Sequence, residues 1–310
     1  MIYTLSLNPA LDKTVTVPSF TPGSVNRIRA VRTDIGGKGI NVSKCLKALG
    51  CPSIAVGFFG GQMGRNAVKE LETNGIDVLS VAVDEEMRTN LKIVDPDSGF
   101  TTDLNEPGPH ITPEKMQELT QLLFTALQPG DLLVLSGSLP GGVPKTIYRD
   151  LILLAHQKGA QVFLDADGVP LKLALEAVPD LIKPNQNELS RLLDIPLTTL
   201  DQITDAASCL LGQGVGAVLV SLGENGALLV RPDGIWKADG LQVPVQSTVG
   251  AGDSMVAAMA YSQITGTAPA EQLRLATAIS TASVMQTGTQ APDKSLIDSL
   301  IPRIHIIPII

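Results

Sequence analysis

Short apolar runs of β type recur along this chain, each followed by a turn rich in Gly, Pro or Asn and then by an amphipathic stretch. The runs are Ile2–Leu7, Ser53–Phe58, Asp131–Leu135, Gln161–Leu164, Leu181–Lys183 and Ala217–Ser221. The clearest helix signal follows Thr112-Pro113, an N-cap and N1 pair, with apolar residues at helical spacing behind it. Alternating strands and helices predict an α/β fold, in which a mostly parallel central sheet carries helices on both faces.

Two regions break this rhythm because polar and apolar residues alternate one by one. They are about Lys13–Thr33 and Arg88–Leu104, as in Thr14-Val15-Thr16-Val17 and Leu91-Lys92-Ile93-Val94. Such alternation is typical of half-buried antiparallel strands. We therefore expect a small sheet, built from insertions at about 13–33 and 88–104, at the edge of a single large domain spanning residues 1–310. A sheet in that place can close over a ligand.

Charge and composition exclude several kinds of partner. The chain has 23 basic and 31 acidic side chains, a net charge of −8, and only 6 Phe, 3 Tyr and 1 Trp. Nucleic-acid binding is disfavoured because it needs a positive surface and exposed rings. No apolar stretch approaches the roughly 18 residues of a membrane span, and the apolar tail 304–310 is expected to pack against the body or a partner. We expect no signal peptide, and the few scattered cysteines fit a cytoplasmic protein without disulfides or zinc.

Ligands of open α/β sheets bind at the carboxyl ends of the strands, so the loops there should hold the functional residues. In Gly36–Asn41, glycines let backbone approach an anion at a helix start, and Lys38 adds charge; a plain turn with a solvated lysine is the alternative. In Ser247–Ser254, the segment Gly250–Gly252 can turn successive N–H groups toward a phosphoryl group. Asp253 is then a candidate general base for an attacking hydroxyl, or else only a cap of the following helix.

Two further loops at strand ends fit a nucleotide. Ser221–Ala227 holds two glycines three residues apart, in a turn able to pass under phosphates; a simple turn between strands is the alternative. In Lys183–Glu188, Asn185 and Glu188 lie on one helical face, where oxygen ligands suit a hydrated Mg²⁺. Helix capping by Asn185, with Glu188 at the surface, is the alternative for this loop.

Together and in this order, the four loops resemble the signatures of the PfkB (ribokinase-like) family of carbohydrate kinases. The N-terminal signature is similar to Gly36–Val42 and the C-terminal signature to Ser247–Met255. Thr4–Asp12, Ser136–Pro140 and Lys183–Asn185 resemble the hexose-phosphate branch, which holds 1-phosphofructokinases, tagatose-6-phosphate kinases and minor 6-phosphofructokinases. The resemblance runs as far as about residue 303. It implies a three-layer α/β/α ribokinase-like fold with a small β-sheet lid.

The resemblance also implies a role for each matching residue. Asp253 would be the base, and the anion hole would consist of Gly250, Ala251 and Gly252. Besides Asp253, the residues that would bind the sugar phosphate are Asp12, Gly37, Lys38, Asn41, Arg88 and Ser138. The residues that would face ATP are Lys183, Asn185, Ser221, Gly223 and Gly226. Glu188 would bind Mg²⁺, and some members of the family also bind K⁺ through backbone around Ser247, Val249, Ser283 and Gly288.

The reaction that the resemblance implies is ATP-dependent phosphorylation of a ketohexose phosphate at a primary hydroxyl. Lys38 and the loop at Asp253 favour fructose 1-phosphate, with fructose 1,6-bisphosphate as product, whereas Gly108–Thr112 is closer to the tagatose enzymes. Tagatose 6-phosphate and fructose 6-phosphate therefore stay open as substrates. A noncatalytic sugar-phosphate sensor is the alternative of another class, although the intact Asp253 argues against it. A nicotinamide dehydrogenase is disfavoured because the first strand runs into Asn8-Pro9 rather than a GxGxxG turn. The family further implies a homodimer that pairs through the lid sheet.

Overall fold

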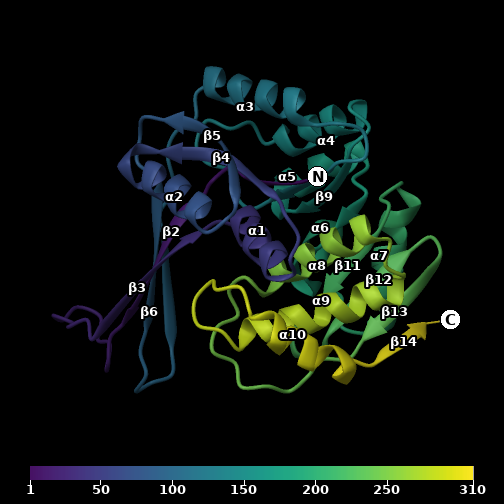
Figure 1. The fold of residues 1–310 in the computed structure, drawn as a ribbon. Coiled ribbons are helices and arrows are strands. Elements are labelled where there is room, and N and C mark those ends of the chain that lie inside the picture. The colour runs from purple at the N-terminus through teal and green to yellow at the C-terminus, as the bar shows by residue number, and fades with distance from the viewer. Residues whose placement is uncertain (310) are drawn as a thin grey trace.

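The computed structural model describes residues 1–309, which form a large sheet, helices on both of its faces and a small second sheet (Figure 1). The large sheet has the strand order β14-β13-β12-β11-β10-β9-β8-β1-β4-β5. In chain order its strands are β1 (Ile2–Ser6), β4 (Ile54–Gly60), β5 (Asp77–Val83), β8 (Leu132–Ser136), β9 (Gln161–Asp165), β10 (Leu181–Ile182), β11 (Val218–Ser221), β12 (Ala227–Arg231), β13 (Gly234–Ala238) and β14 (Ile306–Ile309). Neighbours from β5 to β11 are parallel, and β12, β13 and β14 extend the sheet antiparallel.

Each of the six predicted runs forms a strand of this sheet, with ends that differ by one or two residues. The predicted fold class is confirmed. In β8, Leu133 and Leu135 pack into the core on one face, while Leu132 and Val134 pack into the core on the other. A strand that is buried on both faces forms a nearly continuous apolar run, so such strands can be predicted from the sequence. The tail packs against the body as β14 beside β13, and Ile310 lies outside the described residues.

Helices cover both faces of the sheet. One face carries α3 (Pro113–Ala126), α4 (Ile147–Gln157), α5 (Gly168–Ala174), α6 (Gln186–Leu193) and α7 (Leu200–Gly212). The other carries α1 (Lys38–Ala48), α2 (Gly61–Thr73), α8 (Ala251–Thr265), α9 (Pro269–Val284) and α10 (Lys294–Leu300). The predicted cap of α3 is confirmed, since the Thr112 side chain accepts a hydrogen bond from the Lys115 N–H. Within residues 1–309, no helix combines the length and the apolar character that crossing a bilayer requires.

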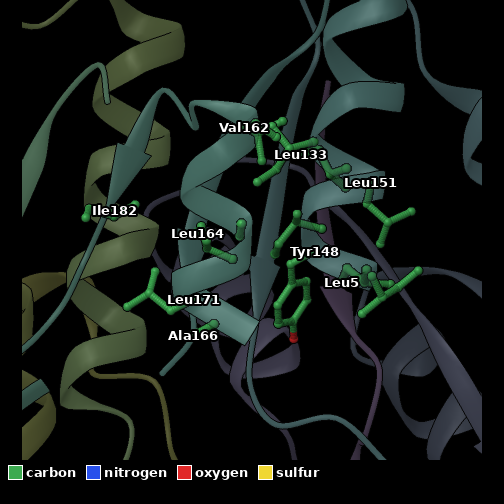
Figure 2. Packing of buried hydrophobic residues seen from close by; sticks show 14 of the residues in the cluster. Leu5, Leu133, Tyr148, Leu151, Val162, Leu164, Ala166, Leu171 and Ile182 are labelled. Carbon is green, nitrogen blue, oxygen red and sulfur yellow. The ribbon is translucent and has the colours of Figure 1, made fainter. Parts of the chain in front are cut away.

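Tyr148 of α4 links the core to the loops at the carboxyl edge of the sheet. Its ring lies among the leucines of β8 and β9, including Leu133 and Leu164, and is fully buried (Figure 2). Its hydroxyl donates a 2.9 Å hydrogen bond to the carbonyl of Gly137, directly after β8. Burial raises the pKa of this hydroxyl well above its usual value, so it stays a donor. The loop after β8 is therefore held by a rigid core side chain.

The small sheet, here called the lid, has the strand order β3-β2-β6-β7 and projects from the body (Figure 1). Its strands are β2 (Ala10–Thr16), β3 (Ala30–Gly36), β6 (Arg88–Val94) and β7 (Thr101–Asn105). The lid arises from two separate hairpins, as predicted, but the first hairpin is longer than 13–33. The central pair, β2 and β6, is parallel rather than antiparallel, because the first strands of both hairpins leave the body side by side in the same direction. The strand β7 is exposed along its whole length because it forms an edge of the lid.

Candidate active site

A cleft of about 970 Å³ is lined by the lid and by the loops at the carboxyl ends of the parallel strands. It brings together residues far apart in the chain, including Asp12, Lys38, Arg88, Lys183 and Asp253. Every residue predicted to act in catalysis or to bind the sugar phosphate, ATP or Mg²⁺ lines this cleft, except Ser138. Ser138 is exposed and lies outside this lining, and its hydroxyl accepts a 3.5 Å hydrogen bond from the side-chain amide of Asn8. The four predicted loops line this one cleft. Only the loops after β10 and β11 follow strands of the parallel sheet, as expected for an open α/β sheet. The loop at residues 36–41 instead follows β3 of the lid, and the loop at residues 247–254 follows an irregular segment after the antiparallel strand β13.

Asp253 lies in the first turn of α8, which begins at Ala251. Gly250 precedes this helix in a left-handed conformation, with φ of 82°, which favours glycine. No side chain caps the helix, and the Asp253 carboxylate instead accepts a 2.8 Å hydrogen bond from the side-chain amide of Asn41 in α1. The interpretation of Asp253 as a mere cap is therefore wrong, because its bond goes to another element across the cleft.

The surroundings of Asp253 suit a general base. It is buried, and that burial together with the nearby carboxylate of Asp165 raises its pKa to about 6. The ammonium groups of Lys38 and Lys183 act in the opposite direction, which limits the rise. A carboxylate with a pKa near 6 is ionised at neutral pH and accepts a proton more readily than an ordinary aspartate. The adjacent N–H groups of Gly250–Gly252 lie at the positive end of α8.

Asp165 is a charged residue of the cleft that no predicted motif contains. It ends β9 and is 1% exposed. Its Oδ1 lies 3.2 Å from Lys38 Nζ and 3.4 Å from Lys183 Nζ. Burial alone would raise the pKa of Asp165, but the two lysines outweigh it and hold that pKa below its usual value. Its position in the sequence does indicate a functional residue, because Asp165 directly follows the predicted run Gln161–Leu164, at the sheet edge where ligands of open α/β sheets bind.

The lid contributes a carboxylate and a guanidinium to the cleft. Asp12 of β2 accepts a 2.9 Å hydrogen bond from Asn90 of β6, and burial raises the pKa of Asp12. Arg88 opens β6 and donates to the backbone carbonyls of Asn8 at 3.2 Å and Glu106 at 3.3 Å. Within residues 1–309 Arg88 forms no salt bridge with a carboxylate, so its charge is available to an anion. Asn90 belongs to none of the predicted motifs, although it lies in the same strand as Arg88.

The other end of the cleft is formed by the turns after β10 and β11. Asn185 and Glu188 form a capping box at α6, in which each side chain accepts a 2.8 Å hydrogen bond from the backbone N–H of the other. Asn185 therefore does cap the helix, as the alternative prediction had it. Glu188, however, is half-buried and lines the cleft, whereas that alternative placed it at the surface. At Gly226, a Cβ would lie 2.1 Å from the carbonyl oxygen of Ala238, so close chain approach alone demands glycine there.

The residues at this end fit a hydrated Mg²⁺ bound with a nucleotide. Within residues 1–309, no three His, Cys, Asp or Glu side chains cluster closely enough to hold a metal by themselves. Mg²⁺ in phosphoryl-transfer sites needs only one or two carboxylates, because substrate phosphates and waters supply the rest. The capping box uses Glu188 Oε2. Glu188 Oε1 makes no hydrogen bond to another described residue, which leaves it for a metal-bound water or the ion.

The loop before α8 and the C-terminal end of α9 lie side by side. The backbone N–H groups of Gln246 and Ser247 donate to the carbonyl of Val284, at 2.7 and 3.2 Å. This contact brings the loop before α8 against the end of α9. The hydroxyls of Ser283 and Thr289 are buried there without a hydrogen-bond partner among the described residues. Buried polar groups in proteins usually have a partner, so these two hydroxyls leave hydrogen-bonding capacity unused at this contact.

Comparison with known proteins decides the family. The family model described as pfkB family carbohydrate kinase matches residues 6–296 of the chain. The chain belongs to this family. It is an ATP-dependent carbohydrate kinase with the ribokinase-like fold.

Individual relatives cover nearly the whole chain. It is 41% identical over 292 residues to a 1-phosphofructokinase of Rhodobacter capsulatus, an alignment covering 94% of this chain and 92% of that protein. Among solved structures, phosphofructokinase-2 of Escherichia coli in complex with fructose-6-phosphate is 31% identical, with a TM-score of 0.91, covering 97% of this chain and 98% of that one. The potassium complex of the same enzyme is 32% identical, with a TM-score of 0.93 and the same coverage.

Proposed function

We propose that this PfkB kinase phosphorylates fructose 1-phosphate at its free primary hydroxyl, with ATP as donor and fructose 1,6-bisphosphate as product. The observation that carries the proposal is Asp253, a buried carboxylate of raised pKa placed beside the N-terminus of α8 and opposite the cations Lys38 and Arg88. A base, an anion hole and a cationic sugar end are the parts that phosphoryl transfer to a sugar phosphate needs. The 41% identity to a 1-phosphofructokinase supports the choice of sugar.

In the proposed mechanism, Asp253 takes the proton of the sugar hydroxyl as its oxygen forms a bond to the γ-phosphorus of ATP. The bond from that phosphorus to the β–γ bridging oxygen breaks, and ADP leaves. The N–H groups of Gly250, Ala251 and Gly252 stabilise the charge on the transferring group. Asp12, Gly37 and Asn41 bind the sugar. Arg88 and Lys38, with Ser138 nearby, bind its phosphate.

The nucleotide occupies the opposite end of the cleft in this proposal. The residues that face it are Lys183, Asn185, Ser221, Gly223 and Gly226. Glu188 would hold Mg²⁺ directly or through water, and the ion would neutralise charge on the ATP phosphates. The loop at Ser247 and Val249 and the turn at Ser283 and Gly288 would hold K⁺ through backbone oxygens. The buried unpaired hydroxyl of Ser283 supports this assignment.

The sugar is tested by measuring ADP release with fructose 1-phosphate, fructose 6-phosphate and tagatose 6-phosphate side by side. We expect kcat/KM for fructose 1-phosphate to exceed the other two by at least about 10-fold, since misplacing the phosphate leaves buried donors unpaired. A higher kcat/KM for tagatose 6-phosphate or fructose 6-phosphate would reassign the enzyme within its family. Binding of a sugar phosphate without ADP release from any of the three would favour the sensor.

We also propose that two copies pair through the lid. Its strands and connecting loops expose large apolar side chains, among them Val25 at 89% and Phe100 at 75% exposure. Exposed apolar side chains gathered on one small sheet mark an interaction surface. Light scattering should give twice the mass of one chain. Replacing Val31, also exposed on the lid, by Asp should shift that mass to one chain, and a monomeric wild-type protein would contradict the proposal.

A further inference from the structure

Asp165 is more buried than any other charged residue of the cleft described above, and it has one free oxygen. Its Oδ1 faces two ammonium groups, Lys38 Nζ at 3.2 Å and Lys183 Nζ at 3.4 Å. Its Oδ2 is buried and has no hydrogen-bond partner among residues 1–309. Burying a carboxylate with one oxygen unpaired lowers the stability of the folded state. Stability alone therefore does not explain why a carboxylate occupies this position.

The two lysines reach Asp165 from different ends of the cleft. Lys38 opens α1 beside Gly37, and 40% of its side chain remains exposed. Lys183 follows β10 and is almost fully buried. Its Nζ lies 3.1 Å from the place where a Cβ on Gly252 would stand, which puts it against the anion hole. One cation thus faces the sugar end, and the other faces the point where the phosphoryl group moves.

We propose that Asp165 is a positioning residue that holds the ammonium groups of Lys38 and Lys183 together on either side of the phosphoryl-transfer path. The inference rests on the proposed function, because it gives these lysines the two phosphorylated substrates as targets. Two ammonium groups this close repel each other, and Lys38 is exposed enough to swing toward solvent. The shared carboxylate cancels that repulsion before any phosphate arrives, so the lysines are preorganised.

Asp165→Asn tests this inference because the amide keeps the shape and removes the charge. We expect kcat to fall about 100-fold with a smaller change in either KM, since the lysines lose their alignment for the transition state. Asp165→Glu keeps the charge but moves the oxygens by one methylene, and we expect it to lose activity too. Asp131→Asn is the matched control, because Asp131 pairs with the N-terminal amine at 2.7 Å, at the start of β8 and away from the cleft. It should lower the melting temperature and leave kcat unchanged.

A second readout does not depend on turnover. Carboxyl ¹³C NMR of the ligand-free protein should show Asp253 titrating near pH 6 in the wild type. The charged groups that face Asp253 are Asp165 from β9, Lys38 from α1 and Lys183 after β10, while Asn41 and the neutral thiol of Cys45 complete its surroundings. Losing the Asp165 charge should shift this titration to lower pH in Asp165→Asn, because only Asp165 among these groups opposes ionisation. In Asp165→Glu it should stay near 6.

The outcomes separate the two proposals. A wild-type protein inactive on all three sugars would sink the proposed function, whereas the Asp253 titration would still report on Asp165. An active wild type with Asp165→Asn within about 2-fold of its kcat would overturn the positioning role alone. An unmoved Asp253 titration in Asp165→Asn would overturn it as well. Failure of both Asp165 variants to fold would also overturn it, because Asp165 would then serve stability rather than the lysines.

Discussion

Replacing Asp253 by Asn should lower kcat by about 10³-fold, within the range that loss of a general base produces. The amide oxygen of the variant can still accept the hydrogen bond from Asn41, so the geometry at the start of α8 should survive. The amide cannot take a proton from the sugar hydroxyl. The measurement is ADP release at saturating sugar phosphate and ATP.

Binding measurements complete this test. Titration calorimetry should show ATP affinity within a few-fold of the wild type, because the nucleotide contacts proposed above do not include the Asp253 carboxylate. The control Asp131→Asn should keep full turnover, because Asp131 lies at the amino end of β8 and not in the cleft. Turnover of Asp253→Asn within about 10-fold of the wild type would remove Asp253 from the role of base.

Arg88→Ala should raise KM for the sugar phosphate about 100-fold, the size expected for a charge-assisted hydrogen bond to a phosphate. Arg88 is held by two backbone carbonyls and forms no salt bridge within residues 1–309, so its charge remains for the substrate. KM for ATP should change little, because the proposed nucleotide site lies at the other end of the cleft. Steady-state kinetics with each substrate varied in turn checks this.

Two comparison variants sharpen the result for Arg88. Arg88→Lys keeps the charge but loses the forked donors and should give an intermediate KM. Arg65→Ala removes an exposed arginine of α2 whose hydrogen bonds go to Gln62, and it should change neither KM. A rise in KM for ATP as large as that for the sugar would show that Arg88 holds the lid as a whole rather than the sugar phosphate.

The parts of the fold that could be predicted are those where local sequence and burial agree. Strands such as β8 are buried along their whole length and consist mostly of apolar residues, so their positions can be predicted from the sequence. The edge strand β5 mixes exposed and buried residues and has no such run. The parallel pairing of β2 with β6 could not be predicted, because alternation along a strand reports its buried face and not the direction of its neighbour.

The same distinction applies to the site. The loops at Gly36–Asn41 and Gly250–Gly252 could be predicted because each contains a position that favours glycine. A Cβ on Gly39 would lie 2.5 Å from the carbonyl oxygen of Leu5, and Gly250 has a left-handed backbone conformation. No glycine or other restricted residue type marks Asp165 in this way. Its role depends on a contact with Lys38, which lies 127 positions away in the sequence. Ser138 matched a motif and yet is an exposed residue outside the lining of the cleft. The motifs therefore predict where the site lies. The contacts of Asp165 with the two lysines can be seen only in the tertiary structure.

The net charge of −8 does not oppose phosphorylated ligands, because the relevant charges are local. Lys38, Arg88 and Lys183 all line the cleft, and the N-terminus of α8 adds a positive dipole end. Asp165, the most buried acidic residue of the same cleft, pairs with two of these cations, Lys38 and Lys183. The overall balance disfavours nucleic acid as a partner without disfavouring nucleotides.

The parallel pairing inside the lid bears on the sugar selectivity of the proposed enzyme. Asp12 on β2 lies opposite Asn90 on β6, and Ala10 lies opposite Arg88, so the residues of both hairpins that we propose to contact the sugar belong to one continuous hydrogen-bonded sheet. In the proposed function they would approach or leave the ligand as a unit. A sugar that misses one of these contacts would then lose others as well, so its binding would weaken by more than that contact contributes. Selectivity would in that case be a cooperative property of the sheet and not a sum over its side chains.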